Sequence, residues 1–224
     1  MYHNIKLIAS VLSILALCAC SDEHDAPAIS AVWSNSHSQE NHRIDCAYPG
    51  QIIRLEGSAL GDLRKLFVNG TEIDIVSNDI YNTPTSVTFQ IPSDVRLSTS
   101  HDEVGYIRLI TAYGEAVHRP FLVLPNKEKP AISRFSTTVL EPDGRLTVTG
   151  SNLSGARKAW LPTVYGGKVE ALVDVEAENT DKQVVLLIPD ATFAQGCAEI
   201  EMAKNHDGFE YTERVYSATT DFSN

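Results

Sequence analysis

The feature that most constrains the fold of this chain is a strand-and-turn pattern that occurs twice, at residues 50–61 and 144–155. In each copy apolar residues alternate with polar ones, which is the period-two pattern of a strand with one buried face. Residues that tolerate a positive φ or form local turns then follow. Aligning the copies pairs Gly57 with Gly150, Ile53 with Leu146 and Leu55 with Val148. The same face is buried in both copies, so the sequence predicts two copies of one β-domain.

Further segments match between the two halves of the chain. Residues 27–30 match 130–133, residues 86–92 match 183–189, and residues 113–114 match 207–208. The separation between matched positions changes only slightly along the chain, as expected for a duplication followed by changes in loop length.

Within each half the apolar segments are short and separated by turn residues. Val87, Phe89 and Ile91 alternate before a proline, and Asn69-Gly70 is a strong hairpin signal. Short, regularly spaced strands without an amphipathic helix predict an all-β fold of two tandem sandwiches. We expect the first sandwich at 27–125, a proline-bounded charged linker at 126–129, the second sandwich at 130–217 and a C-terminal tail at 218–224.

The first 19 residues have the pattern of an export signal. The apolar run at residues 7–17 is shorter than the roughly 20 residues that span a bilayer and suits the core of a signal peptide. A small residue precedes Cys20, which resembles the lipobox of bacterial lipoproteins and implies that Cys20 is acylated. Cys18 suits this role less well because the bulky Leu17 precedes it. An ordinary cleaved signal with incidental cysteines is the alternative.

The segment at residues 20–26 is a short acidic tether. It resembles the surface-export signal of lipoproteins from glycan-foraging Gram-negative bacteria, although acidic runs also serve as plain solvated spacers. Together, these features predict a protein held in the outer membrane by its lipid anchor and facing the cell exterior.

The charge of the chain disfavours polyanionic partners. The sequence has 18 Lys and Arg residues against 29 Asp and Glu residues, a formal net charge of −11, and both halves are acidic. No basic face for phosphate can be identified, so nucleic acid is disfavoured, and sulfated glycans are disfavoured for the same Coulombic reason. Cys46 and Cys197 lie at non-equivalent repeat positions; a bridge between them stays possible, but we expect two buried free thiols.

The repeated motifs resemble the IPT/TIG family of immunoglobulin-like domains. The matching features are Pro-x-Ile-x-x-Val/Phe at the start of each half, then Gly-x-Leu-x-Val-x-Gly-Ser-x-Leu, a strand that ends in Ile-Pro, and a later glycine before the last strand. The resemblance covers residues 27–217. Two departures stand out: the second half has a different hairpin at 161–167, and the first half has extra polar residues around 34–42.

Tandem domains of this kind after a lipobox resemble the surface glycan-binding lipoproteins of starch-utilisation-type uptake systems. The resemblance implies a non-enzymatic protein that binds or presents a neutral polysaccharide or oligosaccharide to an outer-membrane transporter complex. In such proteins the Ig-like domains often serve as stalks and a further C-terminal domain holds the sugar. The sequence ends at Asn224, directly after the second predicted sandwich. The alternative is therefore a structural stalk or adhesin-like module that binds protein, including a truncated homologue that lacks the glycan-binding domain.

Sugar binding requires flat aromatic faces beside polar side chains, and three residues are candidates. Trp33 aligns with Ser136, so the core does not require an aromatic ring there, and it adjoins the extra polar residues. Trp160 aligns with Phe67, and Tyr165 lies in the divergent hairpin. The alternative for each is a structural role, since a Trp in an Ig-like domain is usually a core residue.

No catalytic, metal or cofactor site is predicted. His37 and His42 lie five residues apart on a predicted loop, which does not match the helical spacing of two zinc ligands. The segment 205–208 lacks the alternating acids of a calcium loop and is expected to be a hairpin turn. Carboxylates are abundant, but a glycosidase requires two at a defined separation in a cleft, and no nucleophile-elbow or phosphate-loop motif occurs. We therefore expect no enzyme.

Overall fold

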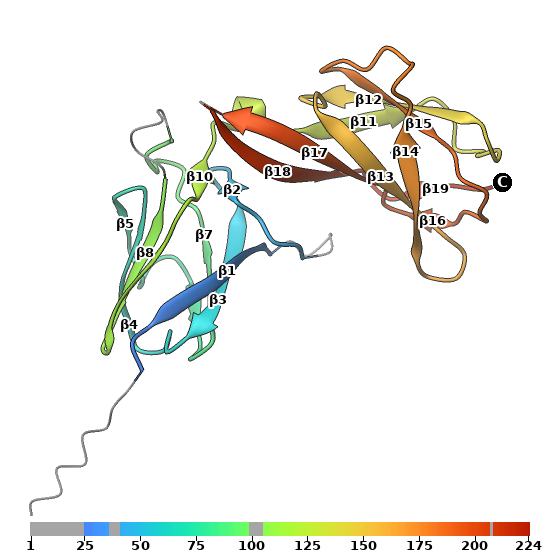
Figure 1. The fold of residues 1–224 in the computed structure, drawn as a ribbon. Helices are drawn as coiled ribbons and strands as arrows, with labels where there is room; N and C mark the ends of the chain where they lie inside the picture. The colour runs from blue at the N-terminus through green and yellow to red at the C-terminus, as the bar shows by residue number, and fades with distance from the viewer. Residues whose placement is uncertain (1–24, 36–40, 99–104, 207) are drawn as a thin grey trace, which may run out of the picture.

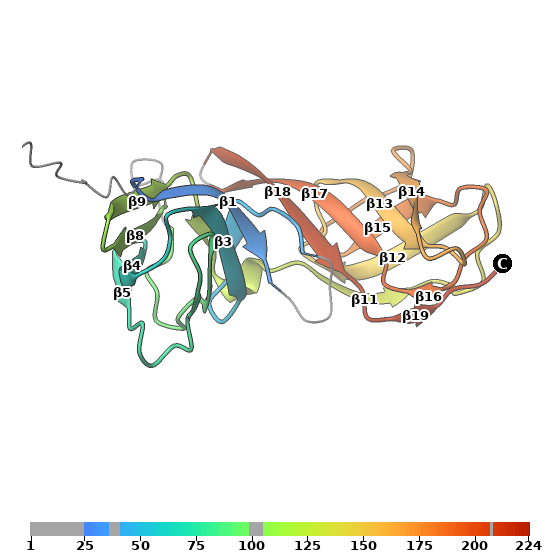
Figure 2. The same cartoon turned by 90° about the horizontal axis from the view of Figure 1, so that it is seen from below.

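The structure is a computed structural model that describes residues 25–35, 41–98, 105–206 and 208–224. The predicted signal peptide, Cys18, Cys20 and most of the acidic tether lie outside the described residues. The fold is all-β, as predicted: apart from one 3-10 turn, η1 (Asn126–Glu128), the described residues contain no helix. None of the described helical segments is long and apolar enough to cross a bilayer. Two sandwiches lie one after the other along the long axis of the molecule (Figures 1 and 2).

The first half consists of two four-stranded antiparallel sheets. One sheet has the order β1 (Ala28–Ser34), β3 (Ile52–Ser58), β7 (Ser86–Gln90) and β6 (Tyr81–Asn82). The other has the order β5 (Thr71–Ile73), β4 (Leu63–Val68), β8 (Ile107–Thr111) and β9 (Gly114–His118). A short parallel pair, β2 (Cys46–Ala47) with β10 (Leu122–Val123), lies at the end that faces the second half.

The second half has a related arrangement in which the two layers are connected. Its strands form a continuous series: β11 (Ala131–Phe135), β12 (Arg145–Ser151), β15 (Gln183–Leu187), β14 (Lys168–Val173), β13 (Ala156–Pro162), β17 (Glu199–His206) and β18 (Phe209–Tyr216). The two layers are joined because β14 pairs with β15. A small additional pair, β16 (Gln195–Gly196) with β19 (Thr220–Asp221), lies near the C-terminus.

The alternating residues that predicted the strands do point into two separate cores. Ile53 and Leu55 are buried in the first core, and Leu146 and Val148 are buried in the second. Each core is made of residues from both layers of its own half, so each half buries its own apolar surface. This separation supports the proposed division at residues 126–129.

The duplication extends to irregular features of the sheets. The pairing of β1 with β3 shifts register between Ile29 and Ala31, and the pairing of β11 with β12 shifts between Ile132 and Arg134. At these bulges a Cβ on Gly57 would meet the backbone carbonyl oxygen of Ala28, and a Cβ on Gly150 would meet that of Ala131. Both strands therefore require glycine for the same reason, which is the close approach of a neighbouring backbone.

The predicted turns also form. Asn69 and Gly70 both have positive φ and connect β4 to β5, as expected of an Asn-Gly hairpin. At the expected turn between β17 and β18, His206 pairs with Phe209, and the Asn205 side chain accepts a hydrogen bond from the Gly208 amide at 2.8 Å; residue 207 lies outside the described residues. In the divergent hairpin, Thr163–Gly167 connects β13 to β14.

One prediction about the C-terminus is wrong. Residues 218–224 were expected to form a tail, but β19 pairs with β16, and Phe222 is buried in the second core against Phe135. The Asn224 side chain also accepts a hydrogen bond from the Phe193 amide. The aromatic ring of Phe222 gains more from burial than the short polar stretch around it loses, so the segment completes the second sandwich.

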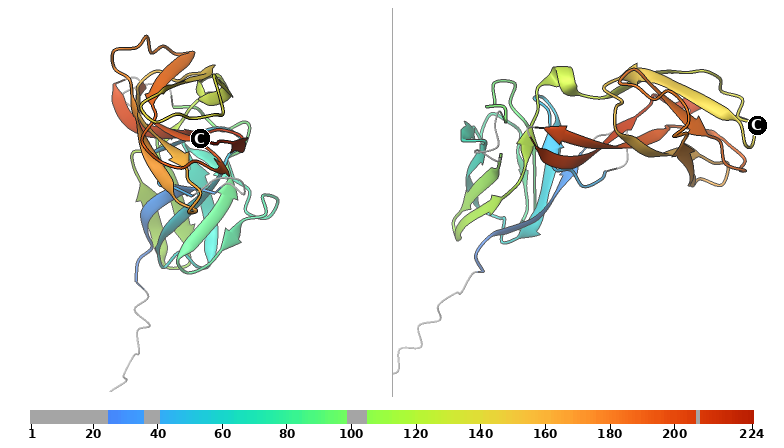
Figure 3. Two further views of the ribbon diagram at one scale, coloured as in Figure 1. Left: turned by 90° about the vertical axis from the view of Figure 1, so that its right-hand side faces the viewer. Right: turned by 45° about the horizontal axis from the view of Figure 1, so that its top comes forward.

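The β17–β18 hairpin connects the two halves. It is the longest hairpin in the fold, and it extends from the second sandwich to the first, where its tip lies beside β2 and β10 (Figures 1 and 3). Tyr211 of β18 is buried in a third apolar cluster together with Cys46, Tyr48, Leu122 and Leu124 of the first half. The linker is held as well, since the Asn152 side chain donates hydrogen bonds to the carbonyls of Lys127 and Lys129. The two halves are therefore packed together and not only tethered.

Candidate functional site

A groove of about 570 Å³ lies at the junction between the two sandwiches. Three parts of the chain line it: the end of β1 with the segments that follow it, the start of β11, and strand β18 from Thr212 to Tyr216. A volume in this range is typical of small-molecule sites. We call this feature the junction groove.

Strand β18 presents its two faces to different surroundings. Tyr211, Glu213 and Val215 are buried, and the first two lie against the first half of the molecule. Arg214 and Tyr216 point to the opposite, outer face of the sheet, as the alternation of a strand requires. The groove therefore has polar groups from both faces of one strand along its wall.

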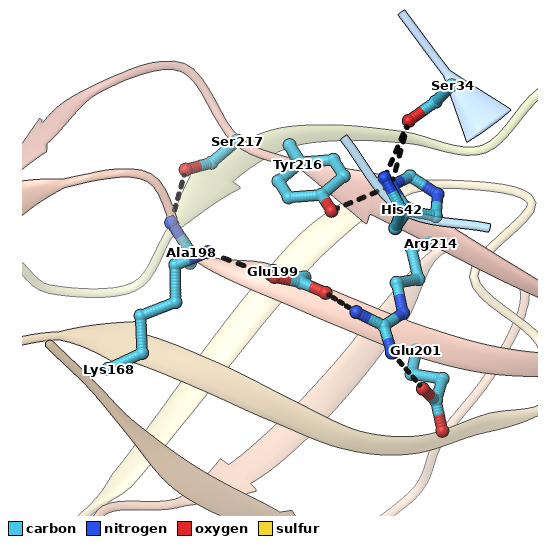
Figure 4. A network of polar contacts seen from close by, with 9 residues as sticks. All are labelled: Ser34, His42, Lys168, Ala198, Glu199, Glu201, Arg214, Tyr216 and Ser217. Carbon is cyan, nitrogen blue, oxygen red and sulfur yellow. Dashed lines mark hydrogen bonds and ion pairs between the residues drawn. The ribbon is translucent and has the colours of Figure 1, made fainter. Parts of the chain in front are cut away.

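The outer face carries a network of ion pairs (Figure 4). Glu199 of β17 is almost fully buried, with 3% of its side chain exposed, and its carboxylate lies 3.0 Å from Lys168 Nζ and 2.8 Å from Arg214 Nη1. Arg214 also donates to Glu201 at 3.1 Å. Two cations balance the buried carboxylate, which is the condition under which such a charge is tolerated in a protein interior. The network fixes the orientation of the Arg214 guanidinium at the rim of the groove.

The network continues into the first half through Tyr216. The hydroxyl of Tyr216 lies 3.0 Å from Nδ1 of His42, and the Ser34 hydroxyl lies 3.1 Å from the same nitrogen. The rings of His42 and Tyr216 are 5.5 Å apart. His42 was expected to lie on a solvated loop; instead it is half-buried and forms part of the contact between the two halves.

Glu213 is the buried acid of the junction. Its carboxylate oxygens both lie 2.8 Å from the Tyr48 hydroxyl, which donates across the boundary between the halves. Burial raises the pKa of Glu213 from 4.5 to about 7, while the Tyr48 hydrogen bond and the positive charges of Lys204 and Lys129 oppose that rise. Burial also raises the pKa of the Tyr48 hydroxyl and of the Cys46 thiol, so both stay protonated at neutral pH.

Trp160 is placed on the outer face, half-buried, beside this network. Its ring lies 4.8 Å from Lys158 Nζ and 5.0 Å from the Arg214 guanidinium. Phe67, with which it aligns, has the same surroundings in the first half: Lys65 at 5.9 Å and Arg108 at 4.2 Å. Cations near an aromatic ring stabilise it through the ring quadrupole. The repeated arrangement gives Trp160 a structural role that Phe67 shares.

Trp33 is placed on the outer face of the first sheet. It pairs with Arg54 of β3, whose guanidinium lies 5.8 Å from the ring. Its indole nitrogen is buried and has no hydrogen-bond partner among the described residues. In the same sheet Arg54 pairs with Thr88 of β7, and Thr88 pairs with the exposed Tyr81 of β6.

Tyr165 is the most exposed of the three aromatic candidates. It lies at the tip of the β13–β14 hairpin, and 92% of its surface is accessible. Neither Tyr165 nor Trp33 nor Trp160 is among the described residues that line the junction groove. The three predicted residues therefore lie outside the groove, on β1, on β13 and in the β13–β14 turn.

The residues that do come together were not predicted as a site from the sequence; they are Tyr48, Glu213, Arg214, Tyr216 and His42. One signal was present for Glu213: it occupies the same alternating positions in β18 as Phe209, Tyr211 and Val215. A carboxylate among apolar residues on one face of a strand indicates a buried polar group. No group of metal-ligating side chains gathers in the described part of the chain. Cys46 and Cys197 are both free, as expected, although Cys197 is only partly buried.

Three solved structures show partial similarity to this chain. The SGBP-B protein of a mixed-linkage glucan utilisation locus from Bacteroides ovatus, in complex with a mixed-linkage heptasaccharide, is 16% identical, with a TM-score of 0.32 over 83% of this chain and 45% of that one. The surface glycan-binding protein PbSGBP-B from Prevotella bryantii is 12% identical, with a TM-score of 0.36 over 85% and 41%. A crystal structure with xylogluco-oligosaccharide is 23% identical, with a TM-score of 0.37 over 89% and 41%.

No protein-family model matches the chain. A curated protein of Bacteroides ovatus named IPT/TIG domain-containing protein is 27% identical over 202 residues, which cover 85% of this chain and 40% of the relative. The chain thus spans about 40% of the length of that relative. The resemblance to IPT/TIG domain proteins that the sequence predicted is confirmed by this relative.

Proposed function

We propose that this protein is a non-enzymatic lipoprotein of the cell surface that binds a neutral glycan and presents it to an outer-membrane polysaccharide uptake system. The observation that carries the proposal is the junction groove, which combines apolar and hydrogen-bonding side chains from both sandwiches. The resemblance of residues 17–20 to a lipobox supports attachment through Cys20 to the outer membrane, with the acidic tether facing outward.

The lining of the groove can accommodate a saccharide. In place of the exposed aromatic face expected from the sequence, the half-buried Ile52 and Ile132 supply apolar surface for the C–H faces of a sugar ring. Asn35 adds a side-chain amide that can both donate to and accept from a hydroxyl group, and Gln51 adds an NH2 group that can donate, since its Oε1 accepts from the Tyr48 amide at 3.1 Å. Binding sites generally combine such an apolar lining with a few polar groups that fix orientation.

The same lining supports binding without catalysis. Hydrolysis of a glycosidic bond requires two carboxyl groups that flank it. Among the described residues that line the groove, Glu213 is the only carboxylic acid, and its carboxyl group is engaged by Tyr48. An acidic glycan would also be repelled by a chain of net charge −11.

We retain Trp33, Trp160 and Tyr165 as proposed stacking residues outside the groove. Tyr165 requires no rearrangement because its ring is exposed. For Trp160, a sugar would have to displace Lys158 or Arg214 from the ring, so its contribution would come at the expense of those contacts.

Affinity electrophoresis of the full chain against a panel of neutral polysaccharides tests the proposal. Retardation by at least one polysaccharide is expected, and the double variant Asn35→Ala/Gln51→Ala should lose most of it. Val76→Ala is the matched control, because Val76 is 87% exposed in a loop of the first half that does not line the groove. No retardation with any polysaccharide contradicts the proposal, as does equal retardation of the double variant and the control.

A second function is favoured by the packed junction. The third apolar cluster and the Tyr48–Glu213 contact hold the halves as one elongated unit, which is what a structural stalk or adhesin-like module that binds protein requires. A stalk is expected to show no retardation by any polysaccharide. Variants that loosen the junction should then impair uptake or adhesion by whole cells, while Asn35→Ala/Gln51→Ala leaves it unchanged.

A further inference from the structure

Glu213 lies where the two sandwiches and the junction groove meet. Glu213 is buried, with 9% of the residue surface exposed, and its carboxyl group accepts a hydrogen bond from a hydroxyl of the other half. Tyr48, its partner, is also buried and belongs to the apolar cluster that joins the halves. Both residues line the groove. A change in the charge of Glu213 therefore acts on the contact between the halves and on the groove at the same place.

The charged and titratable groups around Glu213 come from every element packed against it. The first half contributes Tyr48 and Cys46, the linker contributes Glu128 and Lys129, and the β17–β18 hairpin contributes Lys204 and Tyr211. Cys46 and Tyr211 are themselves neutral over the physiological range because burial raises the pKa of each. The Lys204 ammonium is engaged by the Asn152 carbonyl at 2.6 Å. The two cations do not offset the cost of burying an ionised Glu213.

The geometry points to Glu213 as a proton-dependent contact between the two sandwiches: its protonated carboxyl stabilises the closed junction, and ionisation loosens the junction and the wall of the groove. In the closed state one hydrogen bond joins the carboxyl group to the Tyr48 hydroxyl. When the proton leaves to solvent, the carboxylate gains from hydration that only an opened junction provides. Weaker glycan binding in the opened state rests on the proposed function. The opening of the junction itself does not depend on glycan binding.

The size of the effect follows from the two ionisation states. The pKa of Glu213 is about 7 in the closed junction, against an ordinary value of 4.5 when the group is hydrated. The ratio of closed to open junction then falls by about tenfold between pH 6 and pH 8. A group with a raised pKa stabilises the closed state most at low pH, and that stabilisation is lost as the pH rises through 7.

Amide hydrogen exchange of the full chain at pH 6 and pH 8, converted to protection factors that remove the intrinsic pH dependence of exchange, tests this inference. Protection of the amides of β2 and of residues 211–215 is expected to fall by up to about tenfold at pH 8. In Glu213→Gln, which keeps the shape of the side chain but cannot ionise, protection should be the same at both pH values. Glu210→Gln is the matched control, because Glu210 is an exposed acid on the same strand, and it should behave like the unaltered chain.

Two results overturn the inference: a pH-independent junction in the unaltered chain, or a pH dependence that persists in Glu213→Gln. If Glu213→Gln fails to fold, Tyr48→Phe gives a second readout, because loss of its hydrogen bond should raise the pKa of Glu213 further and move the transition to higher pH. The exchange measurement uses no glycan, so its outcome is independent of whether the groove binds one. A glycan affinity that is absent at both pH values contradicts the proposed function alone.

Discussion

Gly57 and Gly150 occupy the same position at the same bulge in two sandwiches 93 residues apart in sequence. A Cβ built on Gly57 would lie 1.8 Å from the Ala28 carbonyl oxygen, and one built on Gly150 would lie 2.0 Å from that of Ala131. The requirement is steric and does not arise from a positive φ. A duplicated sequence motif thus corresponds to a duplicated steric constraint.

Replacement of either glycine by alanine is expected to destabilise its own sandwich by about 1–3 kcal/mol or more, since backbone must move to admit the methyl group. Gly61→Ala is the control, because its nearest neighbour would lie at an ordinary 3.6 Å. Urea unfolding of the three variants measures the difference. Equal midpoints for Gly57→Ala and Gly61→Ala would show that the close approach at the bulge is not a constraint.

The packing of Phe222 predicts that the C-terminal segment contributes to stability. Phe222→Ala is expected to cost about 3–5 kcal/mol of unfolding free energy, because it leaves a cavity beside Phe135 in the second core. Asp221→Ala, at an exposed neighbouring position, should change little. Thermal unfolding followed by circular dichroism checks both variants. A Phe222→Ala protein as stable as the control would place the segment outside the core.

The raised pKa of Glu213 also predicts a pH dependence of overall stability. Its folded-state pKa, about 7, exceeds the value of 4.5 in the unfolded chain. Its contribution is therefore fully present below pH 4.5 and is lost as the pH rises to 7, by about 3 kcal/mol in total. The difference in unfolding free energy between Glu213→Gln and the unaltered chain should grow in favour of the variant over this range. If this difference in unfolding free energy does not vary with pH, the pKa of Glu213 is not raised in the folded protein.

Tyr48→Phe isolates the hydrogen bond across the junction. The variant keeps the ring in the third apolar cluster and removes only the hydroxyl donor. Leaving the buried carboxyl without this partner is expected to cost about 1–3 kcal/mol. Phe209→Leu, which alters a half-buried residue that packs against the same cluster but donates no hydrogen bond, serves as the comparison. If Tyr48→Phe is as stable as the unaltered chain, the hydroxyl contributes nothing to the junction.

The fold could be predicted from the sequence because its signals are local and repeated. Alternation at Leu146 and Val148, the Asn69-Gly70 turn and the glycine pairs each report on a few neighbouring residues. Duplication doubled these signals and fixed their alignment. The C-terminal segment was misassigned because Phe222 is its one large apolar residue, and its pairing with β16 and the Asn224 hydrogen bond have no local signal in the sequence.

The candidate site could not be predicted in the same way. The groove brings Asn35 and Gln51 next to Thr212 and Tyr216, which are more than 150 residues away in sequence. That proximity depends on the length of the β17–β18 hairpin, which exceeds its counterpart in the first half. Choosing aromatic residues one at a time gave Trp33, Trp160 and Tyr165, none of which is among the described residues that line the groove.

The most direct test of the account is calorimetric titration of the full chain with whichever neutral glycan retards it, beside a variant whose groove is filled. Thr212 is an exposed residue of the groove wall, so Thr212→Trp should occupy the groove without disturbing either core. If the junction groove binds glycan, binding to the unaltered chain and to Val76→Ala is expected to be saturable, and binding to Thr212→Trp at least tenfold weaker. Undiminished binding to the filled groove, or no heat of binding for any neutral glycan, would contradict it.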